Sequence, residues 1–223
     1  MGNAYLRVGN NLHQFNQQAE LTYTHEAVNF GALDQFDPSN PLRIIIFYQD
    51  LMNVVTLDNT LSEASTINLL QLGYQQVTAV ARARDNNIWV YDYISFQLHK
   101  IDGSGRILNQ SEDLNVLLGE PIEGVFIVQS ENEVFMSDPN YGILVFDAYG
   151  TYSRTIPVKG LTEFQIIQGR PVIWDGEALV RINKFLENEV IWEDETLSGV
   201  IEAATVNQHI YLRTNDELII RSF

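Results

Sequence analysis

The chain has 223 residues, of which 45% are hydrophobic and 19% charged, and it contains no cysteine. These proportions are typical of a globular protein, and the lack of cysteine excludes disulfides and thiolate metal sites. The formal net charge is −16, from 13 Lys and Arg against 29 Asp and Glu. This charge argues against binding to nucleic acid, because a phosphate backbone is bound by clustered basic residues.

The start of the chain, Met1-Gly2-Asn3-Ala4, has neither the basic nor the apolar region of a signal peptide. The repeat described below already includes Ala4, which is compatible with a leader removed before Met1. The longest apolar run, 44–48, has the length of a buried strand and is far shorter than the ~20 residues of a membrane-spanning helix. We therefore expect no direct insertion into a membrane.

Short segments rich in β-branched and aromatic residues, separated by Gly, Asn and Asp, follow one another along the chain and are typical of β-strands. In chain order, the expected strands are 4–8, 12–16, 21–23, 42–48, 53–59, 64–69, 78–83, 87–91, 96–102, 106–108, 125–128, 133–137, 142–147, 151–156, 171–174, 178–183, 190–192, 201–205, 209–213 and 218–222. The best helix candidate is 61–72, but Ser65, Thr66 and Asn68 are weak helix formers. We expect an outer strand and a linker there.

The strands form a repeat in which one strand of each copy ends in Asp or Asn. These anchor residues are Asn16, Asp58, Asp102, Asp147 and Asn183, at separations of 42, 44, 45 and 36 residues. A period near 40 with about four strands predicts an all-β fold, a β-propeller, as a single domain over 1–223. We expect six blades with the first and last repeats incomplete. Five blades are the alternative, followed by a sandwich or another all-β fold.

Several copies resemble known propeller repeats. Residues 86–92, followed by 100–105, resemble the NHL-type repeat. The longer stretches 37–61 and 142–161 resemble a family of uncharacterised, exported six-bladed propeller proteins (NHL-like or TolB-like) of Bacteroidota-type bacteria. This resemblance covers nearly the whole chain and implies a periplasmic location, although no signal peptide is present. It also suggests a narrower role, as an accessory of outer-membrane export machinery such as the plug subunit of the type IX secretion translocon.

No catalytic constellation emerges from the sequence. The four histidines, His13, His25, His99 and His209, lie in separate repeats without metal-binding spacing. There is no G-x-S-x-G, Walker or dinucleotide-binding motif, and 103–105 is a hairpin turn. We therefore predict no catalytic, metal or cofactor site and a protein that is not an enzyme.

Two alternatives remain open, namely a hydrolase or lyase at the propeller channel and a ligand sensor there. The expected innermost strands are mostly small or apolar, and their charged exceptions are Arg82, Arg84 and Glu202. Trp89 and Trp174 are expected to pack between blades, and Trp192 to be partly exposed.

The turns between the first two strands of each repeat copy predict a binding face. Equivalent turns of a propeller lie on one face, which would gather Asp50, Asp92, Asp138, Asp175 and Asp216 into a loose acidic ring with aromatic neighbours. The simpler interpretation is that Asp begins tight turns by bonding to the backbone. The predicted partner-binding residues are Tyr48, Asp50, Asp92, Tyr93, Phe96, Asp138 and Tyr141.

Exposed aromatic residues on loops are natural interface anchors, and the acidity would attract a basic partner. The expected function is therefore that of a non-enzymatic protein-binding module or accessory subunit of a cell-envelope assembly. The expected partner is a protein, such as an outer-membrane or secretion complex.

Overall fold

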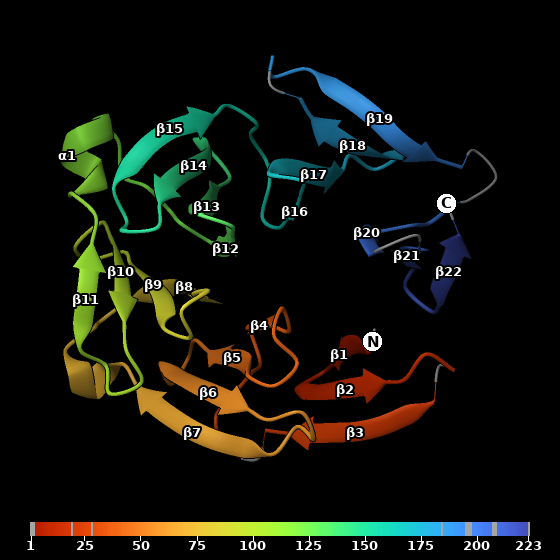
Figure 1. The fold of residues 1–223 in the computed structure, drawn as a ribbon, viewed down its shortest axis with the longest axis horizontal. Helices are drawn as coiled ribbons and strands as arrows, with labels where there is room; N and C mark the ends of the chain where they lie inside the picture. The colour runs from red at the N-terminus through yellow and green to blue at the C-terminus, as the bar shows by residue number, and fades with distance from the viewer. Residues whose placement is uncertain are drawn as a thin grey trace.

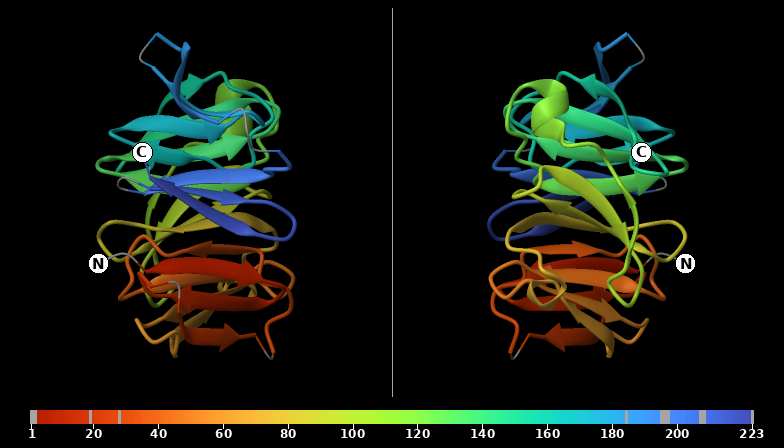
Figure 2. Two further views of the ribbon diagram at one scale, coloured as in Figure 1. Left: turned by 90° about the vertical axis from the view of Figure 1, so that its right-hand side faces the viewer. Right: turned by 90° about the vertical axis from the view of Figure 1, so that its left-hand side faces the viewer.

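A computed structural model describes residues 3–18, 20–27, 29–183, 185–194, 198–206 and 209–222. Six antiparallel sheets stand around a central axis as the blades of a β-propeller (Figure 1). Figure 2 shows this ring from two sides, with the strands of the last sheet above those of the first in the left panel. The predicted all-β propeller with six blades is confirmed, and the alternative with five blades is wrong.

The blades follow one another along the chain. Blade 1 contains β1 (Ala4–Val8), β2 (Asn11–Phe15) and β3 (Leu21–Glu26), and blade 2 contains β4 (Gln35–Asp37), β5 (Ile44–Tyr48), β6 (Asn53–Leu57) and β7 (Glu63–Asn68). Blade 3 contains β8 (Val77–Arg82), β9 (Ile88–Asp92), β10 (Gln97–Ile101) and β11 (Ile107–Gln110), and blade 4 contains β12 (Phe126–Ser130), β13 (Glu133–Asp138), β14 (Gly142–Asp147) and β15 (Tyr152–Ile156). Blade 5 contains β16 (Gln165–Ile167), β17 (Arg170–Trp174), β18 (Ala178–Ile182) and β19 (Asn188–Glu193), and blade 6 contains β20 (Glu202–Val206), β21 (His209–Arg213) and β22 (Leu218–Ser222).

The two end blades have three described strands, and the other four blades have four. By their place in the repeat, β1 to β3 correspond to the second, third and fourth strands of a full blade. Strands β20 to β22 correspond to the first, second and third. The prediction that the first and last repeats are incomplete is therefore confirmed.

The antiparallel order of the strands divides the turns between two faces of the ring. The turns between second and third strands and the linkers between blades lie on one face, which we call the linker face. The turns between third and fourth strands lie on the other, which we call the anchor face because it carries the repeated Asp and Asn residues. Each of these anchors accepts the backbone N–H groups of the residues two and four positions later, at 2.8–3.1 Å, as in Asn16, Asp58, Asp102, Asp147 and Asn183.

The anchor bonds lower the pKa of the anchor carboxylates. Hydrogen bonds from Ser104, first its hydroxyl and then its N–H, lower the pKa of Asp102 to about 2. The equivalent bonds from Thr60 lower the pKa of Asp58. A carboxylate that accepts several hydrogen bonds is stabilised in its charged form. The anchors therefore hold the turns of the anchor face in one geometry, which explains why the sequence repeats them.

Five hydrophobic clusters fill the five interfaces between successive blades. Representative buried residues are Leu12 with Tyr48, Phe47 with Val90, Trp89 with Met136, Phe135 with Val180, and Leu179 with Leu212. Between blades 6 and 1, the described residues form no such cluster, and Val8 and Val206 remain exposed. The predicted inter-blade packing of Trp89 and Trp174 is confirmed, and Trp192 is half-buried as expected.

Side-chain amides connect the innermost strands of neighbouring blades. The Gln35 amide donates to the carbonyl oxygens of Thr78 and Val125, each at 2.9 Å, and accepts the N–H of Val80 at 3.1 Å. In blade 5, Gln165 exchanges two such bonds with the backbone of Thr205 in blade 6. Backbone groups facing the channel are thus paired although the innermost strands belong to separate sheets.

The helical content differs in part from the sequence expectation. Residues 63–68 form the outer strand β7, and a 3₁₀ turn (Leu70–Leu72) lies in the following linker, as expected for 61–72. One short α-helix, α1 (Leu114–Leu118), was not predicted, because five residues are too few to show a helical period. No helix within the described ranges is long and apolar enough to cross a membrane.

Candidate functional site: the α1 patch on the linker face

One linker between blades is longer than the others. The linkers are residues 27–34, 69–76, 111–125, 157–164 and 194–201, so the third has 15 residues where each of the others has eight. The additional residues include α1, which Figure 1 shows at the outside of the ring beside β15. Insertions in single copies of a repeat are often placed on the binding face. The linker between blades 3 and 4 is therefore the first place to search for a site.

Local interactions fix α1 in spite of its short length. Asp113 caps its N-terminus, with Oδ1 accepting the N–H of Val116 at 3.1 Å, and Gly119 ends it with a φ of 77°. The buried Leu114 joins the hydrophobic cluster between blades 3 and 4, and its N–H donates to the carbonyl oxygen of Phe96 at 2.9 Å. The helix is thus held against the turn between β9 and β10.

This anchoring leaves two adjacent apolar side chains in solvent. Val116 is 78% exposed and Leu117 is 48% exposed. The neighbouring turns add further apolar and aromatic side chains. Together they form what we call the α1 patch, which consists of Tyr93, Ile94, Phe96, Val116, Leu117 and Tyr141. Ile94, Val116 and Leu117 are exposed, whereas Tyr93, Phe96 and Tyr141 are half-buried. Exposed apolar patches are typical of interaction sites.

Three of the residues predicted for partner binding fall in this patch. The rings of Tyr93 and Phe96 meet edge to face at a centroid distance of 5.2 Å. Tyr93 and Tyr141 both pack, half-buried, on the cluster between blades 3 and 4. The structure therefore brings Tyr93, Phe96 and Tyr141 to one region of the linker face. Whether they bind a partner stays a prediction.

Phe96 has an unusual backbone conformation, with a φ of 51° in the left-handed region. A bulky residue is strained there, whereas glycine adopts such a φ without penalty. The third strand of blade 5 is preceded at its turn by Gly176, whose φ is 104°. Met52, which directly precedes the third strand of blade 2, has a similar φ of 54° and is buried, so this backbone conformation belongs to the turn.

Two of the predicted acidic residues are buried and have a structural role instead. Asp138 is 1% exposed, and its carboxylate accepts the N–H groups of Asn140, Tyr141 and Glu123 at 2.6–2.7 Å. Asp92 is also buried, and it accepts the N–H of Ile94 and the hydroxyl of Ser95. The prediction that both aspartates face a partner is wrong, because their oxygens are used to shape the turns and to attach the long linker.

Tyr48 is the third correction. Its side chain is 0% exposed, stacks with Phe30, and shares a 2.9 Å hydrogen bond with the buried ring of His25 from blade 1. Burial raises the pKa of Tyr48 to about 12. The position of Tyr48 next to a turn suggested exposure, but the side chain packs between blades 1 and 2. It cannot contact a partner in the folded protein.

The rest of the expected acidic ring is less regular than its sequence pattern. Asp50 is exposed at the turn of blade 2, as predicted, and Asp175 and Asp216 are exposed at the turns of blades 5 and 6. Asp175 also accepts the N–H groups of Glu177 and Ala178. With Asp92 and Asp138 buried, the exposed aspartates do not form a continuous ring.

Several carboxylates nevertheless lie close to the tyrosines of this region. Asp138, Asp92 and Asp113 all act on the Tyr91 hydroxyl beneath the α1 patch, whose pKa is raised by burial first and then by these charges. Desolvation, then Tyr152 and Glu120, raises the pKa of Tyr141. Three carboxylates of the long linker are exposed, namely Glu112, Glu120 and Glu123, and Glu120 is close enough to act on Tyr141. An apolar patch with carboxylates near it favours a basic partner.

A second group of charged residues lies at the linker-face end of the channel. The Arg213 Nε pairs with the Glu202 Oε2 at 2.6 Å, and Arg7 donates to the carbonyl oxygens of Leu33 and Asp34. Glu163 is accessible, yet desolvation and then Glu202 raise its pKa, against the opposing charges of Arg7 and Arg213. The sequence pointed to Glu202 but not to the other three, because they come from three separate elements.

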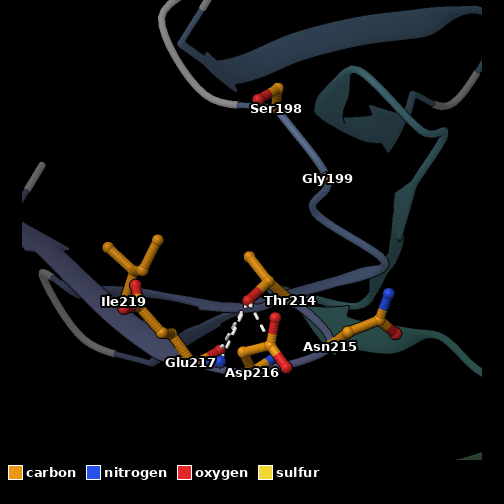
Figure 3. Close-up of a pocket in the computed structure, with 7 residues that line it drawn as sticks. All are labelled: Ser198, Gly199, Thr214, Asn215, Asp216, Glu217 and Ile219. Carbon is orange, nitrogen blue, oxygen red and sulfur yellow. Dashed lines mark hydrogen bonds between the residues drawn. The ribbon is translucent and has the colours of Figure 1, made fainter.

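A shallow cavity of about 370 Å³ lies on blade 6 (Figure 3). Thr214 is at its centre, and its hydroxyl oxygen accepts the N–H groups of Asp216 and Glu217 at 3.3 and 3.0 Å. The lining residues are Ser198, Gly199, Thr214, Asn215, Asp216, Glu217 and Ile219. Asp216 and Glu217 are the ionisable groups of this lining.

The histidines do not come together. His13 bonds to Thr24, His25 to Tyr48 and His99 to Tyr74, each at 2.9 Å, and the exposed His209 lies beside Tyr211. Among the described residues, no three His, Asp or Glu side chains are close enough to share a metal ion. The α1 patch therefore remains the region where sequence-predicted and structural features coincide.

Comparisons with known proteins define the fold only. No protein-family model and no curated protein sequence matches the chain. A streptogramin B lyase superposes with a TM-score of 0.64 over 100% of this chain and 80% of that chain, at 14% identity. A protein of unknown function from Bacteroides caccae gives 0.61 over 96% and 86%, at 11% identity. Virginiamycin B lyase from Staphylococcus aureus gives 0.61 over 96% and 78%, at 12% identity. Function cannot be transferred at such identities, because propellers carry many functions.

Proposed function

We propose that this propeller is a non-catalytic protein-binding module and that its partner docks on the α1 patch. The observation that carries the proposal is the long linker between blades 3 and 4, which presents Val116 and Leu117 to solvent. The patch stands on the cluster that contains Trp89 and Met136, so it is supported by a tightly packed scaffold. Rigid scaffolds that carry a distinctive loop are a common design for binding sites.

The partner is expected to be a basic protein segment with at least one apolar side chain. An apolar anchor would cover Val116 and Phe96, and basic residues would meet the carboxylates of Glu112, Glu120 and Glu123. Long-range electrostatic attraction of a basic partner would add to these local contacts, because the net charge of the chain is −16. Such attraction speeds association and weakens as salt screens it.

The cellular setting follows from the resemblance of the chain to exported propeller proteins. That resemblance supports a periplasmic accessory subunit of a cell-envelope assembly, and the plug of a type IX secretion translocon is its narrower form. Detection of the native protein in a periplasmic fraction of its host is the measurement that tests the location.

The proposed binding site is tested with variants that spare the core. The double variant Val116→Asp/Leu117→Asp should keep the fold and raise the Kd for a purified partner by at least about tenfold, since anchor residues typically contribute that much. Phe96→Gly should act in the same direction, because it removes the ring and relieves the strained φ. The matched control is Leu42→Asp, which changes a side chain of similar type, 68% exposed, in the turn 38–43 on the anchor face.

Binding is measured by calorimetry on wild type and variants, and folding by circular dichroism. An unchanged Kd in both α1-patch variants, or an equal loss in Leu42→Asp, would show that the partner binds elsewhere. The change of Tyr93 and Phe96 together to Ala is a further test. If native extract still yields the same partner with that variant, the linker face near blade 3 is not the binding face.

A second candidate function is recognition of a small ligand or a reaction at the channel. The raised pKa of Glu163, which lies within electrostatic range of Glu202, Arg7 and Arg213, favours this candidate, and the structural neighbours include two lyases. Under this candidate, small amines or amino acids should raise the Tm of the wild type and not that of Glu163→Gln. No shift with such a panel would leave the protein-binding proposal as the better supported one.

A further inference from the structure

Three arginines lie at the anchor-face end of two neighbouring innermost strands. Turn 38–43 joins β4 to β5 and contains Arg43. Arg82 is the last residue of β8, and Arg84 follows two residues later. The two segments are linked, because the Asp37 carboxylate at the end of β4 accepts the backbone N–H of Arg82 at 3.0 Å. Since β4 and β8 are on the inner side of the ring (Figure 1), the arginines lie near one end of the channel.

The guanidinium of Arg82 has an unsatisfied donor. Among the described residues, its Nε is the one buried side-chain nitrogen or oxygen that has no hydrogen-bond partner. Its Nη2 donates a long hydrogen bond of 3.4 Å to the Asn86 Oδ1. A buried donor without an acceptor destabilises the folded state, and native proteins seldom contain one. The Nε of Arg82 therefore calls for an acceptor from outside the chain.

The acidic residues of the same two segments bind other groups. Both oxygens of Asp37 accept backbone N–H groups, one of them from Arg82. Asp85, in the turn after β8, pairs with the Lys100 Nζ at 2.8 Å. None of the three arginines takes part in an ion pair between described residues. Their positive charge is thus left without a paired carboxylate, although the net charge of the chain is −16.

We propose that this end of the channel binds a small molecule through a carboxylate or phosphate group, with Arg82 as the main binding residue and Arg84 and Arg43 beside it. A guanidinium carries five N–H donors in a planar fork, and two of them bind two oxygens of such a group side by side. Arg82 is only half-buried, so its long side chain turns the Nε edge towards the ligand as the ligand binds. The Nε thereby gains its acceptor.

The overall charge selects a small ligand. The net charge of −16 repels a polyanion such as nucleic acid. A small anion avoids most of this repulsion, because salt screens charges that lie farther away than about 8–10 Å. The site is also separate from the α1 patch, which lies on the linker face. Binding of a small anion and docking of a protein partner are therefore independent properties of the propeller.

Calorimetric titration with inorganic phosphate and with succinate, at an ionic strength kept constant with chloride, tests the site. The wild type should bind at least one probe with a Kd below about 1 mM, and the preferred probe identifies the group that is recognised. Arg82→Gln and the conservative Arg82→Lys should each raise that Kd at least about tenfold, because neither side chain supplies the planar fork. Arg84→Gln, which changes an exposed side chain, should raise the Kd less.

Nuclear magnetic resonance of arginine side chains in the wild type gives a second readout. The ¹⁵N–¹H resonance of the Arg82 Nε should shift when the bound probe is added, because this donor gains an acceptor. The Nε of Arg106 already donates to the Asp102 Oδ2 at 3.1 Å. Its resonance should stay in place. This comparison does not depend on the folding of any variant.

The matched control is Arg221→Gln, an equal loss of charge at an exposed position of β22. It should keep the wild-type Kd, and circular dichroism should show the same fold for every variant. Three results would overturn the proposal: no binding of either probe up to about 10 mM, an Arg82 Nε resonance that does not move, or an equal weakening in Arg221→Gln. None of them bears on partner docking at the α1 patch, which the variants of Val116 and Leu117 test.

Discussion

Blades 2–4 and the two end blades are built from the same repeat, but their strands differ in burial. Every residue of β5, β6 and β9 is buried, whereas the equivalent second and third strands of the end blades, β1, β2 and β21, contain four buried residues among them. Each middle blade packs between two neighbours, and each end blade contributes to one hydrophobic cluster. The repeat sequence therefore specifies the strands of each blade, whereas packing against the neighbouring blades supplies most of the stability of that blade.

The largest expected effect is on the free energy of unfolding when a tyrosine on the second strand of a blade is replaced by alanine. Tyr91 in blade 3 is buried and donates to the carbonyl oxygen of Ile122 at 2.8 Å, whereas Tyr211 in blade 6 is half-buried. Tyr91→Ala should lower the free energy of unfolding by about 3–5 kcal/mol, and Tyr211→Ala by about 1 kcal/mol. Denaturant titrations followed by circular dichroism measure both. Equal losses would contradict the claim that the middle blades dominate stability.

A smaller difference in stability loss is expected between variants of Gln35 and Gln165, whose side-chain amides connect innermost strands. Gln35 makes three hydrogen bonds among blades 2, 3 and 4, and Gln165 makes two between blades 5 and 6. Replacement of Gln35 by Leu should lower the free energy of unfolding by about 3 kcal/mol, because channel-facing backbone groups lose their partners. Gln165→Leu should lower it by about 1–2 kcal/mol. A larger effect at Gln165 would reverse the ranking of the two regions.

The smallest expected effect is a loss of folding stability at acidic pH. Burial lowers the pKa of His25, at the interface of blades 1 and 2, and of His99, at that of blades 2 and 3, from 6.5. Both rings are therefore neutral when folded, and the unfolded chain takes up their protons first as pH falls. Their stabilising contribution is complete above about pH 6.5 and is lost progressively below it.

Unfolding free energies between pH 7.5 and 5 should consequently fall more steeply for wild type than for His25→Gln or His99→Gln. The control is His13→Gln, on β2, whose ring bonds to Thr24 rather than to a neighbouring blade. If wild type and both variants lose stability in parallel, the buried histidines do not cause the acid sensitivity.

The fold could be predicted because its signals are local and repeated. Asn16, Asp58 and Asp102 mark the same turn in successive blades, and each side chain bonds the backbone within four residues. Their spacing alone therefore locates the blades. The innermost strands β4 and β16 escaped prediction because each has three residues, which is too short for a recognisable alternation.

The site was predicted only in part because exposure depends on tertiary packing. Tyr48 and Tyr93 occupy comparable places beside turns, yet Tyr48 is covered by His25 of the preceding blade and by Phe30 of the linker that follows that blade. Asp138 looked like an exposed acid, but its oxygens bind backbone N–H groups of two separate segments. No feature of the sequence singled out Val116. It stands out because its linker is longer than the others, and the linker lengths are known only once the strands have been located.

The proposed docking site is tested most directly by site-specific photo-crosslinking in native extract. A photoreactive phenylalanine replaces Val116 in the α1 patch in one sample and Leu42 on the anchor face in another; both positions are exposed. The account predicts one dominant protein adduct from position 116, reduced when Phe96→Gly is added and weaker at high salt, and none from position 42. An equal adduct from position 42, or no adduct from position 116, would contradict it.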